Sequence, residues 1–128
     1  MDDRTIEILK RFDASWEKTG AWYDNLITQH EGFERLIPIR KFIDNLALAG
    51  GKKLYRLGNS MHTLMISRSL DHGLRTDQKY VSIEAIGTDC FEVKMREGSK
   101  TYREYKVKSL QDVRVSKLLQ TLKGVLVD

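Results

Sequence analysis

Lys53-Leu54-Tyr55-Arg56-Leu57-Gly58-Asn59-Ser60 is the stretch that decides the fold, because the residue pattern changes here from helical to strand-like. It reads as a short basic strand that ends at a Gly-Asn-Ser turn. An apolar strand, Thr63-Leu64-Met65-Ile66, follows the turn. Glycine and asparagine favour tight turns, so we expect Arg56 on a fixed backbone at the rim of a small sheet. A compact domain can place cations at such a rim against DNA phosphates and base edges.

The composition is typical of one folded domain. The 128 residues are 41% hydrophobic and 31% charged, with a single proline, which argues against a disordered chain. No apolar run approaches the roughly 20 residues that a membrane-spanning helix needs, so no membrane association is expected. The opening residues Met1-Asp2-Asp3-Arg4 lack the apolar segment of a secretory signal. Cys90, the single cysteine, cannot form an internal disulfide, which favours a cytoplasmic location.

The net positive charge of the chain comes from its second part, residues 51–128. Residues 1–50 carry 7 Lys/Arg and 9 Asp/Glu, a net charge of −2, whereas residues 51–128 carry 15 and 9, a net charge of +6. Such a division is typical of a protein that contacts nucleic acid through one part of its surface. A basic solvated surface without a partner is the alternative interpretation.

Residues 1–50 are predicted to form a helical N-terminal region. Apolar residues from Ile6 to Trp16 recur at helical spacing, and a second helix is expected after Gly20. Pro38 suits the first turn of a third helix, because its missing N–H has no partner to lose there. That helix should end at Gly50-Gly51, a typical C-terminal signal.

Residues 51–108 alternate in the manner of strands, and 109–128 return to a helical pattern. Ser109 can cap the final helix, with Asp112 favourable in its first turn. The fold class is therefore α+β: N-terminal helices, a small antiparallel sheet and a C-terminal helix. We expect strands near 53–57, 61–67, 79–86, 89–96 and 101–107.

Residues 52–96 carry a resemblance to a known family. Arg56-Leu57-Gly58-Asn59-Ser60 forms the turn, and a second strand, a short helix at 69–74, a polar turn at 75–79 and two strands follow in the family's order. This order resembles the swapped-hairpin DNA-binding domain of the AbrB/MazE/SpoVT family. The resemblance implies that two chains interleave their hairpins into one barrel-like core. It also implies a homodimeric, sequence-specific transcription regulator of double-stranded DNA.

The residues expected at the DNA follow from this resemblance and from side-chain chemistry. An arginine in the turn can contact a guanine edge or clamp a phosphate, although its stem can instead pack on Tyr55 or Tyr80. The lysines that precede this arginine would contact DNA phosphates, which positions the protein on the DNA without recognising the base sequence. Asparagine in the turn can also serve the left-handed turn conformation. The DNA-binding candidates are Lys52, Lys53, Arg56, Asn59, Arg68 and Arg75.

No catalytic, metal or cofactor pattern is present. His30, His62 and His72 are scattered, and their spacing does not pair them with Cys90 as a zinc site requires. The chain has no Gly-rich phosphate loop or nucleophile elbow. We therefore expect a protein that is not an enzyme and needs no cofactor.

A later strand, 102–108, alternates aromatic and basic residues, a combination that can bind single-stranded nucleic acid. In a regular strand, however, Tyr102 and Tyr105 lie on opposite faces and cannot form one platform.

Two other interpretations stay open. The chain can be a protein-interaction module, antitoxin-like or inhibitory, whose partner binds residues 1–50 or the C-terminal helix. It can also be an unrelated α+β fold with helices packed on a five-stranded antiparallel sheet and a small-molecule cleft.

Overall fold

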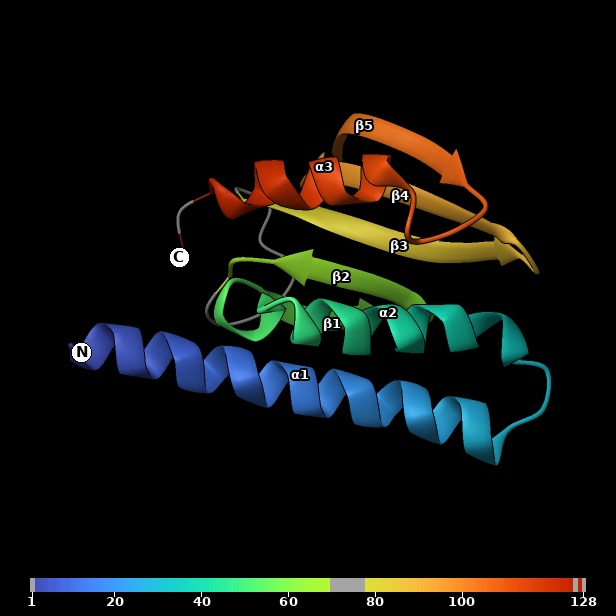
Figure 1. Ribbon diagram of the computed structural model, residues 1–128, viewed down its shortest axis with the longest axis horizontal. Coiled ribbons are helices and arrows are strands. Elements are labelled where there is room, and N and C mark those ends of the chain that lie inside the picture. Colours follow the sequence, from blue (N-terminus) through green and yellow to red (C-terminus); the bar gives the residue numbers. More distant parts are fainter. Residues whose placement is uncertain (1, 70–77, 126, 128) are drawn as a thin grey trace.

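The computed structural model describes residues 2–69, 78–125 and 127. In these ranges, helices α1 (Asp3–Gln29) and α2 (Ile37–Leu48) precede an antiparallel sheet, and α3 (Val113–Lys123) follows it (Figure 1). The α+β class predicted from the sequence is confirmed, with helices packed on a five-stranded sheet. Short 3₁₀ helices, η1 (Glu34–Leu36) and η2 (Gly51–Lys53), flank α2. The strands are β1 (Arg56–Ser60), β2 (Thr63–Ser67), β3 (Lys79–Gly87), β4 (Cys90–Glu97) and β5 (Lys100–Val107).

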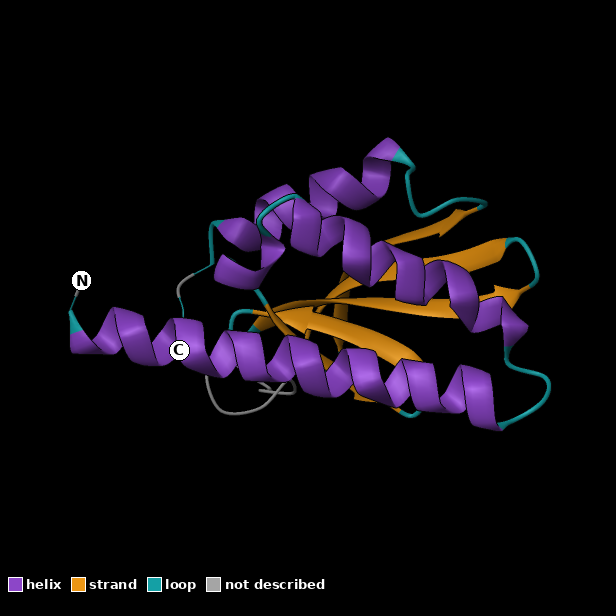
Figure 2. Ribbon diagram, turned by 60° about the horizontal axis from the view of Figure 1, so that its bottom comes forward, coloured by secondary structure: helices purple, strands orange, loops and turns teal. Residues whose placement is uncertain are grey.

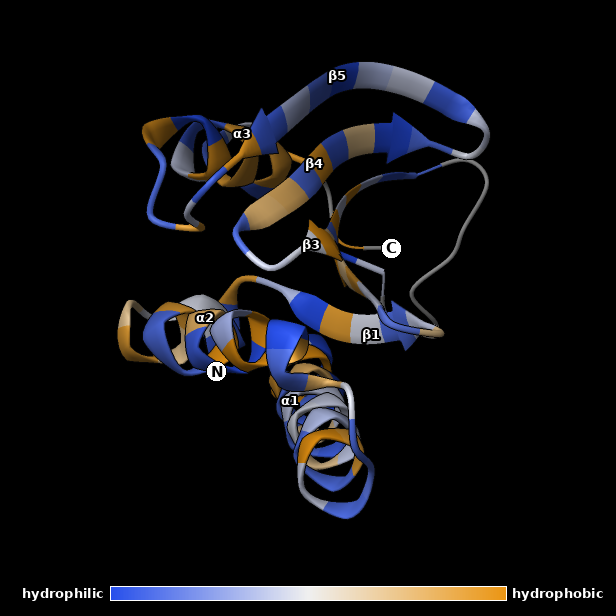
Figure 3. Cartoon of the chain, turned by 90° about the vertical axis from the view of Figure 1, so that its right-hand side faces the viewer, coloured by the Kyte–Doolittle hydropathy of each residue, from blue (hydrophilic) through white to orange (hydrophobic). Residues whose placement is uncertain are grey.

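The five strands pair in sequence order, so that β1 and β5 form the two edges of the sheet. The register places Leu57, Ile66, Val81 and Met95 opposite one another across four strands, and all four are buried. Residues directly opposite in an antiparallel pair share a face, so this row belongs to one apolar face. Figure 3 shows α2 and α3 on the same side of the sheet, with α1 beneath β1.

The helices and the sheet share one hydrophobic core. Trp16 of α1, Phe42 of α2 and Leu119 of α3 belong to the same cluster of buried side chains as the central strands. All three regions expected from the sequence therefore contribute to one interior. A single chain forms this core, so the swapped-hairpin dimeric barrel implied by the family resemblance is not confirmed.

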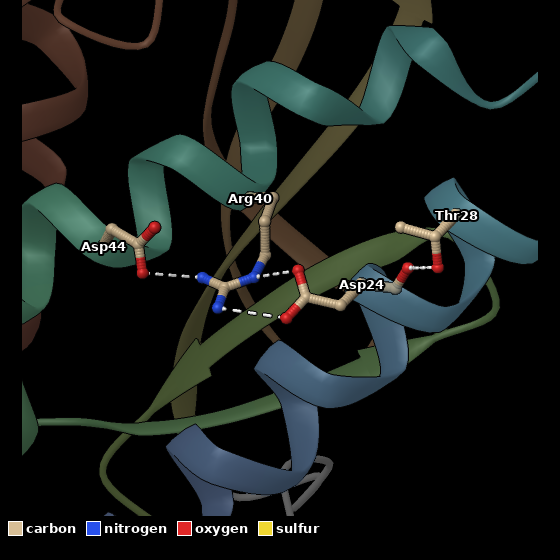
Figure 4. Close-up of polar contacts among 4 residues, drawn as sticks. All are labelled: Asp24, Thr28, Arg40 and Asp44. Atoms are coloured by element: carbon tan, nitrogen blue, oxygen red, sulfur yellow. Dashed lines mark hydrogen bonds and ion pairs between the residues drawn. The ribbon is translucent and has the colours of Figure 1, made fainter.

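Helix α1 runs for 27 residues without a break (Figure 2). The predicted break at Gly20 is wrong, because this glycine serves helix packing. A Cβ at Gly20 would lie 3.3 Å from the Arg40 guanidinium, which binds Asp24 of α1 and Asp44 of α2, each at 2.8 Å (Figure 4). Among the helices of the described ranges, none combines enough length with enough apolar residues to span a bilayer.

Local sequence signals predict the ends of α2 correctly but not the start of α3. Pro38 occupies the first turn of α2 as predicted, and Gly50 follows the helix with a left-handed φ of 91°. The prediction that Ser109 caps the last helix is wrong. Asp112 caps α3 instead, accepting a hydrogen bond from the Arg114 backbone N–H at 2.9 Å. A carboxylate two residues before that N–H reaches it directly.

The first strand lies three residues later than predicted. Gly58, Asn59 and Ser60 continue β1, and the chain turns at Met61, whose φ of 52° is left-handed. The Asn59 side-chain amide donates a hydrogen bond to the Met61 carbonyl at 3.0 Å. Asn59 therefore stabilises the turn although it lies in the strand that precedes it. Arg56 is therefore the first residue of the edge strand β1 and does not lie next to the turn.

Side chains of α1 bind two backbone groups where the edge strand β1 begins. The Ser15 hydroxyl accepts a hydrogen bond from the Leu57 backbone N–H at 3.0 Å and donates to the Phe12 carbonyl at 2.6 Å. The Trp16 indole donates to the Tyr55 carbonyl at 2.8 Å. Unpaired backbone groups at a sheet edge invite another strand, and here a helix takes that position.

The Ser15 contact predicts a stability effect. Ser15→Ala would leave the buried Leu57 N–H without a partner and should lower the free energy of unfolding by about 1–3 kcal/mol, measured by urea denaturation. Thr28→Ala is the matched control, because the exposed Thr28 hydroxyl donates a similar hydrogen bond within α1, to the backbone carbonyl of Asp24 at 2.7 Å. Equal losses in the two variants would contradict the role given to Ser15.

Candidate functional site

The structure describes five of the six predicted DNA-binding residues, and it does not bring these five onto one surface. Lys52 and Lys53 are exposed on η2, where the Lys52 ammonium lies 3.9 Å from the Asp13 carboxylate. Arg56 is half-buried at the start of β1 and lines a groove between α1 and β1. Asn59 lines the same groove, and its side-chain amide donates to the Met61 carbonyl at the β1–β2 turn. Arg75 lies outside the described residues.

Arg68 is half-buried and is bound to two backbone carbonyls of the fold. Its guanidinium donates to the Leu54 carbonyl at 2.6 Å and to the Val125 carbonyl at 2.5 Å. Burial lowers the pKa of this guanidinium from its usual value. Arg68 therefore links three distant parts of the chain, and neither of these two contacts presents it to a ligand.

Arg68→Met should therefore act on stability. Removing the guanidinium leaves two carbonyls without their donor, and the free energy of unfolding should fall by about 2–4 kcal/mol in urea denaturation. Arg103→Met removes an exposed guanidinium from β5 and should change it by less than about 0.5 kcal/mol. A wild-type midpoint for Arg68→Met would exclude the structural role.

Basic side chains gather instead between β5 and α3. A hollow of about 300 Å³ opens there, and no carboxylate is among the described residues that line it. The hollow is lined by two tyrosines of β5 and by basic side chains from β3, β5 and α3. Lys100 joins them, because its ammonium lies over one of the two rings. We call the following residues the β5–α3 surface: Lys79, Lys100, Tyr102, Arg103, Tyr105, Arg114 and Lys117.

A β-bulge brings the two tyrosines to one hollow. Arg103 pairs with Met95, whereas the next residue of β4, Arg96, pairs with Thr101, so that Tyr102 is an extra residue in β5. Such an insertion shifts the alternation of side chains along the strand. The expectation that Tyr102 and Tyr105 lie apart is therefore wrong, since it assumed a regular strand.

Cations lie over both rings. The ammonium groups of Lys79 and Lys100 are 5.1 Å and 4.8 Å from the centre of the Tyr102 ring, and the Arg114 guanidinium is 5.3 Å from that of Tyr105. Each such contact contributes about 0.5–1 kcal/mol at an exposed site. The rings thus position positive groups at the surface. In the described part of the chain, no carboxylate lies within ion-pair distance of Lys79, Lys100 or Lys117.

Two carboxylates at the margin hold members of this surface in place. The Tyr102 hydroxyl donates to Glu97 at 2.6 Å, and this hydrogen bond raises the pKa of the tyrosine. Asp112 binds the Arg114 guanidinium through both oxygens, each at 3.0 Å. Hydrogen bonds from the Arg114 side chain, and then from its backbone N–H, lower the pKa of Asp112 to about 2.

The Asp112 shift sets a pH dependence. A carboxyl group with a lowered folded-state pKa stabilises the fold above its ordinary value of 3.8, and this contribution is lost as the pH falls toward 2. Asp112→Asn should be less stable than wild type at pH 7, and the difference should shrink between pH 4 and pH 2. Urea midpoints measured across this range test it; a difference independent of pH would exclude the charge effect.

Within the described ranges, no group of three or more His, Cys, Asp or Glu residues is arranged to hold a metal ion. Comparison with family models, curated proteins and solved structures gave no match to this chain.

Proposed function

We propose that this chain is a non-catalytic DNA-binding protein, of the kind that regulates transcription, and that it holds DNA at the β5–α3 surface. One observation carries the proposal: cations from β3, β5 and α3 converge on a hollow whose described lining has no carboxylate. Phosphate oxygens are strong acceptors, and lysine and arginine are their usual partners in proteins.

The tyrosine rings favour binding by pre-positioning these cations. A lysine on a solvated strand loses much rotamer freedom when it binds, whereas an ammonium already held over a ring loses less. The net charge of +6 in residues 51–128 adds attraction at longer range.

Duplex DNA fits this surface better than a single strand. The rings of Tyr102 and Tyr105 already carry cations, so stacking a base on them would require these groups to move. Phosphate contacts need no such movement, and double-stranded DNA carries the higher charge density, about one charge per 1.7 Å of its axis. Sequence-specific reading and the homodimer, which the family resemblance implies, stay predictions.

A protein partner is the second candidate. The polar face of the sheet has a hollow of about 240 Å³ lined by both Glu84 and Glu92 and by Lys94 and Arg96. Glu84 lies directly opposite Glu92, and like charges in this position destabilise a sheet. Lys94 offsets part of this repulsion, since it binds Glu92 at 2.8 Å. A partner that offers a further cation suits this face, whereas DNA phosphates do not.

The DNA proposal predicts a change in salt dependence. Lys100→Ala/Lys117→Ala should weaken duplex binding and reduce the slope of log K against log salt by about 2, since each lost phosphate contact removes about 0.9. The measurement is fluorescence anisotropy with a random-sequence duplex over a series of salt concentrations. The matched control is Lys10→Ala/Lys41→Ala, which removes the same charge from exposed positions on α1 and α2.

Equal slopes in the two double variants would show that net charge alone drives binding and would overturn the assignment of the site. Absence of wild-type binding even at low salt would overturn the DNA proposal and favour the protein partner.

A further inference from the structure

The groove between α1 and β1 is separate from the β5–α3 surface. Its volume is about 620 Å³, and it shares no lining residue with the hollow of that surface. Trp22 of α1 and Met65 of β2 supply apolar walls, and Leu57 of β1 is also among the lining residues. Pockets that bind small molecules are typically apolar clefts of this size with a few polar groups, about 300–1,000 Å³.

Gly58 provides the room in this groove. A Cβ built at Gly58 would meet no atom within 4 Å, and its φ is not in the left-handed region. The backbone therefore does not require glycine at this position. Glycine inside a strand weakens it and often marks a place where a ligand approaches the backbone closely.

Basic side chains are among the residues that line the groove. Lys18 of α1 and Arg56 of β1 both line it, and no Asp or Glu is among its described lining residues. Apolar walls combined with a cation at the margin suit a ligand that has an apolar body and one negative group.

The edge of β1 excludes an extended peptide as the best occupant. A peptide that adds to a sheet depends on free backbone groups along the edge strand. Here the Leu57 N–H already donates to the Ser15 hydroxyl, and α1 lies along that edge. We propose that the α1–β1 groove binds a small amphipathic carboxylate, with its apolar body over Gly58 and its carboxylate toward Lys18.

Titration with 2-naphthoate tests this proposal. Trp22 lines the groove whereas Trp16 is buried in the core, so changes in tryptophan fluorescence should report binding. Gly58→Leu fills the groove and should weaken binding at least about tenfold, equivalent to about 1.4 kcal/mol. Gly87→Leu is the matched control, because Gly87 also lies in a strand and a Cβ added there would be 3.7 Å from the Cys90 side chain. The affinity of this variant for 2-naphthoate should equal that of the wild type.

The charge is tested separately. Lys18→Gln should weaken 2-naphthoate binding about fivefold, since an exposed ion pair contributes up to about 1 kcal/mol. The neutral analogue 2-naphthalenemethanol should bind to the wild type more weakly than 2-naphthoate does. Its affinity should be the same for the wild type and for Lys18→Gln.

Amide NMR spectra of the wild type provide a readout that needs no variant to fold. Addition of 2-naphthoate should shift the signals of the Gly58 amide and the Trp22 indole N–H. Absence of saturable binding at millimolar 2-naphthoate, shifts confined to other regions, or equal affinity in folded Gly58→Leu would overturn the proposal. These outcomes are independent of the salt dependence of DNA binding, so the two proposals can fail separately.

Discussion

The start of the edge strand β1 is held by side chains of α1 through two backbone groups. The Ser15 hydroxyl binds the Leu57 N–H, and the Trp16 indole binds the Tyr55 carbonyl. A helix thus occupies the position where a further strand would otherwise pair. Because α1 is fixed there, α2 can pack through the Arg40 ion pairs, and the core closes within one chain. The α1–β1 groove results from the same contact.

Much of the fold follows from local patterns that a sequence displays directly. The apolar periodicity of the helices, Pro38 at the start of α2 and the left-handed Gly50 after it depend only on neighbouring residues. The strand alternation of 79–107 is equally local. Gly20 and Gly58 look like breakers for the same local reason, yet one accommodates Arg40 from another helix and the other leaves space beside α1. Such roles depend on contacts between distant segments, which composition and spacing do not contain.

The candidate site was predicted less well than the fold. The excess of positive charge after residue 50 was evident, but its placement depends on the extra residue at Tyr102. A bulge has no reliable signature in a single sequence, and it reverses which side chains of a strand share a surface. Arg68 shows the opposite case: its position suggested a contact with DNA, but its guanidinium binds two half-buried backbone carbonyls of the same chain.

The two edges of the sheet are managed by different physics. Helix α1 covers β1, whereas the sheet ends at β5, whose residues are mostly exposed. Lys100, Arg103 and Lys106 on that strand make a second copy of β5 a repulsive neighbour. Protection against edge-to-edge aggregation is therefore electrostatic on this side and weakens as ions screen it. A bound polyanion would remove the same repulsion, so that loading this strand with ligand also lowers the barrier to self-association.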